Sequence, residues 1–366
     1  MINQNDITFE WLVQISKRYR NTDKALVEKL IRALLLLEGL AKQNLNFVFK
    51  GGTALMLHFN STKRLSLDID IVLPQEVENF EMFLDNIVEN QGFLRKELQQ
   101  RNTQSKIKKE HYKFFFKPLH KTKSDEAYVL LDVLYEKVNY KHLIIMPIQS
   151  SFIPMINNPL TVNIPSLDDI LGDKLTAFAP NTTGIPYFKN DDSKSMEIIK
   201  QLYDIGSLAD VVSDIEIVRN TFYSFAQTEL AYRNLDQTPE DVLNDIYQTA
   251  LCIVTRGLDG NGNFSELQKG IQRIANLIFS ENYHIEKAIT HATKAAYFAT
   301  LIRHNASLIE KFDNRQQMDK WLINKPLNTK LNKFKKSNPE AFFYWYKIFE
   351  FEIIAKGKTP LSPKNP

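Results

Sequence analysis

The chain has 366 residues, of which 43% are hydrophobic and 24% are charged, so it has ample apolar material for a core and the composition of an ordinary globular protein. This length predicts two domains, or one large domain with an extension. The formal net charge of +3 is too small to indicate nucleic-acid binding by itself, which only local patches could support.

Cysteine content and hydropathy exclude further classes. The single cysteine, Cys252, excludes an intramolecular disulfide and a zinc site built from several cysteines, and its apolar surroundings indicate packing. The N-terminal residues lack a basic segment followed by an apolar stretch, so they predict no secretory signal. The most apolar run, residues 31–41, is far too short to span a membrane. We therefore expect a cytoplasmic protein with no membrane association.

The N-terminal region predicts two helices, over residues 7–19 and about 24–43. Residues 21–23 (NTD) offer capping side chains to the second helix. Leucines recur along that helix at three- and four-residue steps, which is typical of a helix that packs against a core.

The segment of residues 47–73 carries the pattern around which the chain is organised. Residues 47–49 predict a buried strand, residues 50–53 (KGGT) a turn and residues 54–59 a helix. After a polar turn, polar and apolar residues alternate, which predicts a second strand over residues 65–73.

That alternation places Ser66, Asp68 and Asp70 on one face of the predicted strand. Two carboxylates one pleat apart, close in sequence to a glycine turn, predict a site for a metal ion and phosphates. A third carboxylate, Asp132, lies within a later apolar strand predicted over residues 128–136. A carboxylate in a buried strand is costly unless it is paired or bound to a metal.

The intervening residues predict a helix over 76–92, a polar basic stretch from Arg95 to Lys109 that includes Arg101 and Lys106, and a strand from His111. Short strands follow within residues 144–164. A helix then begins after Ser166, with Asp169 in a capping-box position, and carries Lys174.

The C-terminal part predicts helices without convincing strand alternation. Residues 180–194 predict a turn-rich loop, and a helix over residues 195–208 carries Asp204. We therefore predict domains over residues 1–210 and 211–366, with the boundary near residues 207–213. The helices predicted beyond it cover residues 216–233, 239–258, 264–279, 285–305 and 339–355.

The three carboxylates suit divalent cations. Magnesium prefers oxygen ligands and usually shares them with substrate phosphates, and two such ions can hold the attacking and leaving oxygens of a phosphoryl displacement. Glycines allow backbone N–H groups to approach a triphosphate closely, and a following helix N-terminus adds a favourable dipole. The turn is not a Walker loop, because Lys50 precedes the glycines.

The ordered motifs KGGTAL (residues 50–55) and RLSLDID (residues 64–70) resemble those of polymerase-β-type nucleotidyltransferases. They are more similar still to the AbiEii/AbiGii toxins of type IV toxin–antitoxin and abortive-infection systems. Two further motifs agree, DILGDKL (residues 169–175) and LYDI (residues 202–205). The resemblance covers about residues 45–210 and implies an α+β fold, in which a nucleotidyltransferase domain with a mixed sheet precedes an α-helical domain.

The resemblance also implies roles for individual residues. Asp68, Asp70 and Asp132 would bind metal ions, and Asp132 would also help to deprotonate the acceptor hydroxyl. Lys174 would neutralise the triphosphate, and Asp204 would position Lys174 or the nucleotide. The implied nucleotide-binding residues are Lys50, Gly51, Gly52, Thr53, Arg64, Ser66 and Lys174.

Two of these roles stay open. Gly52 stands where the superfamily often has serine, so either the Thr53 or the Ser66 hydroxyl could contact phosphate. Arg64 is either a phosphate contact or a solvent-facing turn residue.

The function implied is that of a metal-dependent nucleotidyltransferase toxin. It would use an NTP, with GTP among the candidates, and two Mg²⁺ ions, with Mn²⁺ as an alternative. Its acceptor would be tRNA or another RNA, and its partner a cognate antitoxin. The alternatives are a non-catalytic nucleotide-binding module and an enzyme that modifies a protein or a small molecule.

Other clusters have simpler interpretations. The basic residues 106–113 could bind an RNA backbone or form a solvated loop. The aromatic clusters at residues 114–116 and 342–346 indicate core packing rather than base stacking. His284, His291 and His304 are too scattered to predict a metal site.

Overall fold

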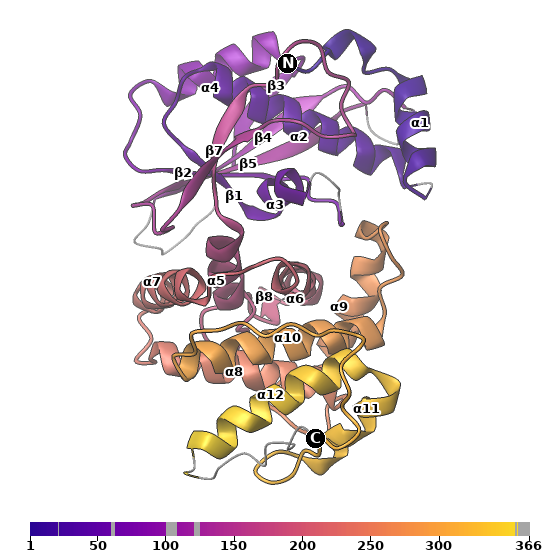
Figure 1. Cartoon of the computed structure of the whole chain (residues 1–366). Helices are drawn as coiled ribbons and strands as arrows, with labels where there is room; N and C mark the ends of the chain where they lie inside the picture. The colour runs from indigo at the N-terminus through magenta and orange to yellow at the C-terminus, as the bar shows by residue number, and fades with distance from the viewer. Residues whose placement is uncertain (21, 60–62, 100–107, 121–124, 356, 358–366) are drawn as a thin grey trace. The chain divides into compact units, whose positions relative to one another are not determined.

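The computed structural model describes residues 1–20, 22–59, 63–99, 108–120, 125–355 and 357 (Figure 1). Contacts divide the chain into two compact units, one formed by residues 1–166 and 276–282 and the other by residues 167–275 and 283–366. The boundary predicted near residues 207–213 therefore falls inside the second unit. Among the described residues, no helix has the length and apolar character needed to cross a membrane.

The first unit is built on one mixed sheet, which has seven strands among the described residues, in the order β3-β4-β5-β2-β1-β7-β6. Two of its pairings, β1 with β7 and β2 with β5, are parallel, and the others are antiparallel. The strands are β1 (Val48–Lys50), β2 (Ile69–Leu73), β3 (Arg95–Leu98), β4 (Lys109–Phe116), β5 (Ala127–Tyr135), β6 (Leu143–Pro147) and β7 (Thr161–Pro165).

The four α-helices described in this unit are α1 (Phe9–Arg18), α2 (Lys24–Lys42), α3 (Gly51–Phe59) and α4 (Phe80–Asn90). Helix α2 begins after Asp23, whose carboxylate accepts a hydrogen bond of 2.7 Å from the Ala25 N–H. Its leucines from Leu30 to Leu40 are buried and Leu26 is half-buried, and the helix contacts β2, β5 and α4.

Alternate residues of the central strands are buried in one core, as period-two patterning requires. On β2 these residues are Ile69, Ile71 and Leu73, and on β5 they include Leu131 and Val133. The intervening side chains project from the opposite face, which is the face that carries the polar residues discussed below.

The second unit is largely helical. Its elements are α5 (Leu167–Ala177), α6 (Ser195–Ala209), α7 (Ile215–Arg233), α8 (Pro239–Val254), α9 (Phe264–Ile274), α10 (Ile285–Arg303), α11 (Phe334–Ser337), α12 (Pro339–Ala355) and the short strands β8 (Phe188–Lys189) and β9 (Asp192–Ser193). Of the described 3₁₀ helices, η1 (Gln4–Asp6) belongs to the first unit, η3 (Thr329–Lys333) belongs to the second, and η2 (Ala275–Leu277) crosses the division between residues 275 and 276. Helices α5 and α6 contact α7, α9 and α10, which explains why they belong to this unit.

The structure differs from the sequence analysis, or adds to it, at three local points. The strand predicted from residue 65 begins only at Ile69, because the Leu65 N–H donates instead to the Leu277 carbonyl at 2.8 Å. The residues Gly51 and Gly52 form the first turn of α3 rather than a separate turn. The polar stretch that begins at Arg95 contains strand β3. The predictions on Asn21, residues 60–62, Arg101 and Lys106 lie outside the described residues.

Candidate active site

A row of four polar side chains crosses the middle of the sheet. In the strand register, Lys50 of β1 is the partner of Asp70 on β2, and Asp70 is the partner of Asp132 on β5. His111 of β4 is in turn the partner of Asp132. Directly paired residues project from the same face of a sheet, with Cβ atoms about 5 Å apart. The register therefore brings two of the three predicted carboxylates next to each other.

His111 supplies the partner that a carboxylate in an apolar strand requires. Its Nδ1 lies 2.6 Å from Asp132 Oδ1, and since a carboxylate can only accept, the imidazole donates this hydrogen bond. The side chains are 14% and 34% exposed, so the bond is shielded from solvent on the histidine side. Sequence reasoning did not find His111, because its position opposite Asp132 depends on how β4 and β5 pair.

The two glycines lie directly against the segment that carries Ser66 and Asp70. Gly51 has a φ of +82°, and a Cβ atom there would lie 2.1 Å from Asp70 Oδ2. A Cβ atom at Gly52 would lie 2.6 Å from the Ser66 hydroxyl oxygen and 2.7 Å from Arg64 Nη2. The positions therefore require glycine, and the two predicted motifs meet in space.

Further contacts fix the strand that carries Asp70. The Thr53 hydroxyl donates a hydrogen bond of 2.7 Å to the Asp68 carbonyl oxygen, and the Ser66 N–H donates to Met56 Sδ at 3.3 Å. Asp68 itself is exposed and immediately precedes β2.

Arg64 is buried, with only 6% of its surface exposed, so its interpretation as a solvent-facing turn residue was wrong. Its Nη1 donates to the Leu65 carbonyl oxygen at 3.1 Å. Its backbone forms a β-bridge with Ile278, which explains why this turn residue is covered.

Lys174 and Asp204 form a second group, in the other unit. Lys174 Nζ lies 2.9 Å from Asp204 Oδ2, and the two side chains are only 9% and 2% exposed. Lys174 also donates to Gln201 Oε1 at 2.9 Å. The two predicted residues are therefore in direct contact, one on helix α5 and the other on helix α6, which pack against each other.

The donor set of the first group fits a cation that is held jointly with a substrate. Among the residues described, no three His, Cys, Asp or Glu side chains are grouped so that they could hold a metal ion alone. The adjacent carboxylates of Asp70 and Asp132 are what a magnesium ion commonly takes from a protein, since it fills its remaining positions with water and phosphate oxygens.

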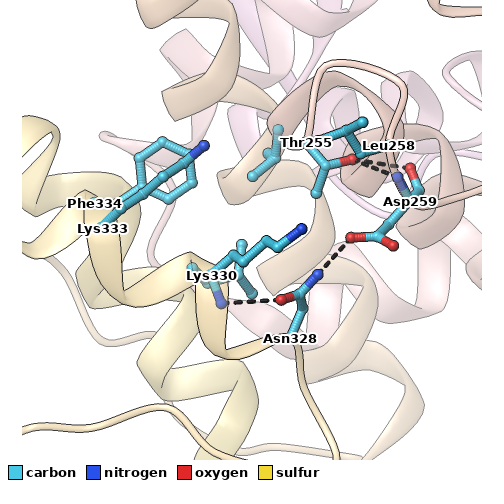
Figure 2. Close-up of a pocket in the computed structure, with 9 residues that line it drawn as sticks. Thr255, Leu258, Asp259, Asn328, Lys330, Lys333 and Phe334 are labelled. Carbon is cyan, nitrogen blue, oxygen red and sulfur yellow. Dashed lines mark hydrogen bonds between the residues drawn. The ribbon is translucent and has the colours of Figure 1, made fainter.

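A separate cavity in the second unit has a different character. Figure 2 shows it beside Asp259, Asn328 and Lys330, and it contains none of the predicted site residues. Asn328 Nδ2 donates to Asp259 Oδ2 at 2.5 Å, and Asn328 Oδ1 accepts from the Lys330 N–H at 2.9 Å. Its volume of ≈ 20 Å³ for water-sized molecules admits about one water, which is too small for a nucleotide.

A comparison with protein families decides the assignment. The family described as "Nucleotidyl transferase AbiEii toxin, Type IV TA system" matches residues 35–270, more than half of the chain. The chain belongs to the AbiEii family. The predicted family and the predicted α+β fold with a mixed sheet and a helical C-terminal region are thereby confirmed, and this AbiEii protein is a nucleotidyltransferase.

Solved structures were also compared with this AbiEii protein. MenT4, a nucleotidyltransferase toxin from Mycobacterium tuberculosis H37Rv, is 14% identical with a TM-score of 0.48, over 79% of this chain and 89% of that chain. JHP933 from Helicobacter pylori is 15% identical with a TM-score of 0.39, over 76% of this chain and 91% of that chain. No protein with a curated description matched the sequence. The assignment therefore rests on the family match alone.

Proposed function

We propose that this AbiEii-family enzyme transfers a nucleotidyl group from an NTP to a hydroxyl of an RNA acceptor, with tRNA included, in a metal-dependent reaction. The observation that carries the proposal is the register that sets Asp70 beside Asp132, with the Gly51 backbone packed against the Asp70 carboxylate. Adjacent carboxylates with a glycine turn suit a metal-bound triphosphate.

The reaction forms one bond and breaks one. The acceptor oxygen attacks the α-phosphorus of the NTP, the bond from that phosphorus to the bridging oxygen breaks, and pyrophosphate leaves. Asp132 accepts the proton of the acceptor hydroxyl, and His111 holds its carboxylate in place. Two Mg²⁺ ions, or Mn²⁺, would be held by Asp68, Asp70 and Asp132 and would stabilise negative charge on the phosphates.

The phosphate-binding groups come from both sides of the glycine turn. Backbone N–H groups of Gly51 and Gly52 and the hydroxyls of Thr53 and Ser66 are the candidate donors for the phosphates. Lys50 and Arg64 are the candidate cations of the first unit.

Lys174 is the third candidate cation, and it would neutralise triphosphate charge. Its buried ion pair with Asp204 supports a positioning role for that carboxylate. All the proposed residues precede residue 210, so we retain residues 1–210 as the proposed functional domain and 211–366 as its helical extension.

The family name implies a toxin with an antitoxin partner. We propose that this protein acts in the cytoplasm and that a cognate antitoxin opposes it, as in a system that aborts infection. The test below determines which NTP the enzyme prefers, with GTP as one of the candidates.

The test is incubation of the purified protein with each of four α-³²P-labelled NTPs, Mg²⁺ or Mn²⁺, and total RNA or total protein. We expect label in RNA, dependence on the metal, and one preferred NTP. Label in protein or in a small molecule would replace the RNA acceptor. NTP binding by calorimetry without any transfer would favour a non-catalytic nucleotide-binding module.

A further inference from the structure

The outward face of β4 is a strip of basic and aromatic side chains that runs past the candidate site at His111. Along the strand, buried side chains alternate with exposed or partly exposed ones. Because residues two apart share a face, the outward set lies on the face that carries Asp132. The outward residues are Lys109, His111, Lys113 and Phe115, and the buried ones are Tyr112, Phe114 and Phe116.

Aromatic rings continue this face onto β5. Phe115 is the register partner of Tyr128, and their ring centroids are 5.7 Å apart. Tyr128 is 37% exposed, although its side chain is large and partly apolar. The Nζ atoms of Lys113 and Lys29 lie 4.6 Å and 5.2 Å from its ring centroid. The face thus offers a ring surrounded by cations.

Among the described residues, the outward lysines of β4 make no ion pair, although Glu97 of β3 is the register partner of Lys113. The Glu97 carboxylate is instead paired with Arg95. Within the described part of the chain, neither Lys109 nor Lys113 has a carboxylate oxygen within 4 Å of its Nζ. Arg95, which lies over the Phe115 ring at 3.6 Å, differs because it is paired with Glu126 at 2.7 Å. A purely structural role is the alternative, since cation–π contacts between lysines and rings stabilise a sheet. That role would not explain why lysines without an ion pair lie on both sides of His111.

We propose that the basic–aromatic strip, defined as Lys109, Lys113, Phe115 and Tyr128, is the docking surface for the single-stranded end of the RNA acceptor. This inference rests on the proposed function for its RNA substrate and adds the surface that binds it. Lysines bind the phosphate backbone, and exposed rings stack on unpaired bases.

The spacing along β4 relates the strip to the reacting group. Phe115 follows His111 by four residues, which corresponds to about 13 Å at the usual rise of a strand. Since His111 holds Asp132, a strand of RNA on the strip would have its reacting hydroxyl near Asp132 and its preceding nucleotides over Lys113 and Tyr128. An acidic peptide could form ion pairs with the lysines, but it would have no base to stack on the exposed ring.

The test measures binding of a short fluorescent single-stranded RNA by anisotropy, without NTP or metal, so that it does not depend on transfer. The variants are Lys113→Gln and Tyr128→Leu. The matched control is Lys108→Gln, because Lys108 is close in sequence but its Nζ contacts Glu76 at 3.3 Å and Glu110 at 3.5 Å.

We expect Tyr128→Leu to weaken RNA binding about 5- to 150-fold, as for loss of one stacked base. Lys113→Gln should weaken binding and lower the slope of log Kd against log salt by about 1. Lys108→Gln should bind as the wild type does, and the thermal unfolding of all three should be alike.

Three results would overturn the inference. The wild type could fail to bind RNA, or all three variants could bind RNA with the wild-type affinity. The third result is that Lys113→Gln and Tyr128→Leu weaken binding of a poly-glutamate peptide but not of RNA. RNA binding that follows the strip, without nucleotidyl transfer, would instead contradict the proposed function and leave the docking surface standing. Where transfer occurs, Lys113→Gln should raise KM for RNA and leave KM for NTP unchanged.

Discussion

Asp70 on β2 lies directly beside Asp132 on β5, in a parallel register that continues over five residue pairs. Two like charges in directly paired positions repel each other and destabilise a sheet. Lys50 pairs with Asp70 on one side and His111 pairs with Asp132 on the other, so basic or hydrogen-bonding side chains flank the carboxylates. The proposed cation, held between the two carboxylates, would offset their repulsion.

Replacing His111 should separate positioning from folding. His111→Ala removes the donor to Asp132 Oδ1. Because Asp132 is a proposed metal ligand, we expect kcat to fall about 10- to 100-fold, the usual cost of losing a ligand's hydrogen-bond partner. KM for NTP should change little, because His111 holds the carboxylate rather than the nucleotide. Steady-state kinetics with varied NTP measure both values.

The control for this prediction is His111→Asn, whose amide N–H can take the place of the Nδ1 donor. It should recover most of kcat. Equal losses in the Asn and Ala variants would contradict the positioning role of the hydrogen bond.

Gly51 should be required for activity because any side chain there would collide with the Asp70 carboxylate, and not only because of its positive φ. Gly51→Ala puts a Cβ atom 2.1 Å from Asp70 Oδ2, so the carboxylate must move. Misplacing a reacting group by about 1 Å costs about 100-fold in rate, which is the loss of transfer activity we expect. Activity and urea unfolding of the variant are the measurements.

Gly92→Ala is the matched control, since Gly92 has a φ of +71° but a Cβ atom there would be no closer than 3.4 Å to its neighbours. Both variants should lose about 1–3 kcal/mol of stability through backbone strain. Only Gly51→Ala should lose activity. An equal loss of activity in Gly92→Ala would contradict the explanation by collision with Asp70.

How far the sequence predicts this site depends on which interactions fix each residue. Asp132 could be predicted because a carboxylate within an apolar strand needs a partner, whatever the fold. His111 could not, because only the pairing of β4 with β5 makes it that partner. The strand predicted from residue 65 failed since a distant segment, near Leu277, takes the Leu65 N–H.

The buried pair of Lys174 and Asp204 allows stability to be separated from activity. Removing one partner leaves a buried charge uncompensated, so Lys174→Met alone should cost about 3–5 kcal/mol of unfolding free energy. The double variant Lys174→Met/Asp204→Leu should recover most of that stability, because apolar replacements remove both charges.

Transfer activity should stay lost in the double variant, because Lys174 is proposed to neutralise the triphosphate. Chemical denaturation and the labelled-NTP assay report the two properties separately. Recovery of activity together with stability would mean that the pair is structural only.

His58 should make the folded state sensitive to acid. Burial lowers the pKa of His58 below 6.5, although its Nε2 donates to the Pro165 carbonyl oxygen at 2.7 Å, which acts in the opposite direction. Between the folded pKa and 6.5 the unfolded chain binds a proton that the folded chain excludes, so stability rises with pH across this window and falls on acidification.

His58→Gln keeps a side-chain N–H donor but cannot titrate. Urea unfolding from pH 7 down to pH 5 should therefore show a shallower loss of stability in this variant than in the wild type. Parallel pH profiles for the two proteins would mean that His58 does not contribute.

The most direct test of the site is label transfer from α-³²P NTP to RNA by the wild type, Asp70→Asn and Asp132→Asn, measured together with the thermal unfolding of each protein. Asparagine preserves shape and removes the charge that the adjacent carboxylates provide. We predict that both variants remain folded, because relief of the repulsion offsets lost contacts, and that transfer falls to background in each. Transfer at the wild-type rate by either variant would contradict the assignment of Asp70 and Asp132 as the centre of the reaction.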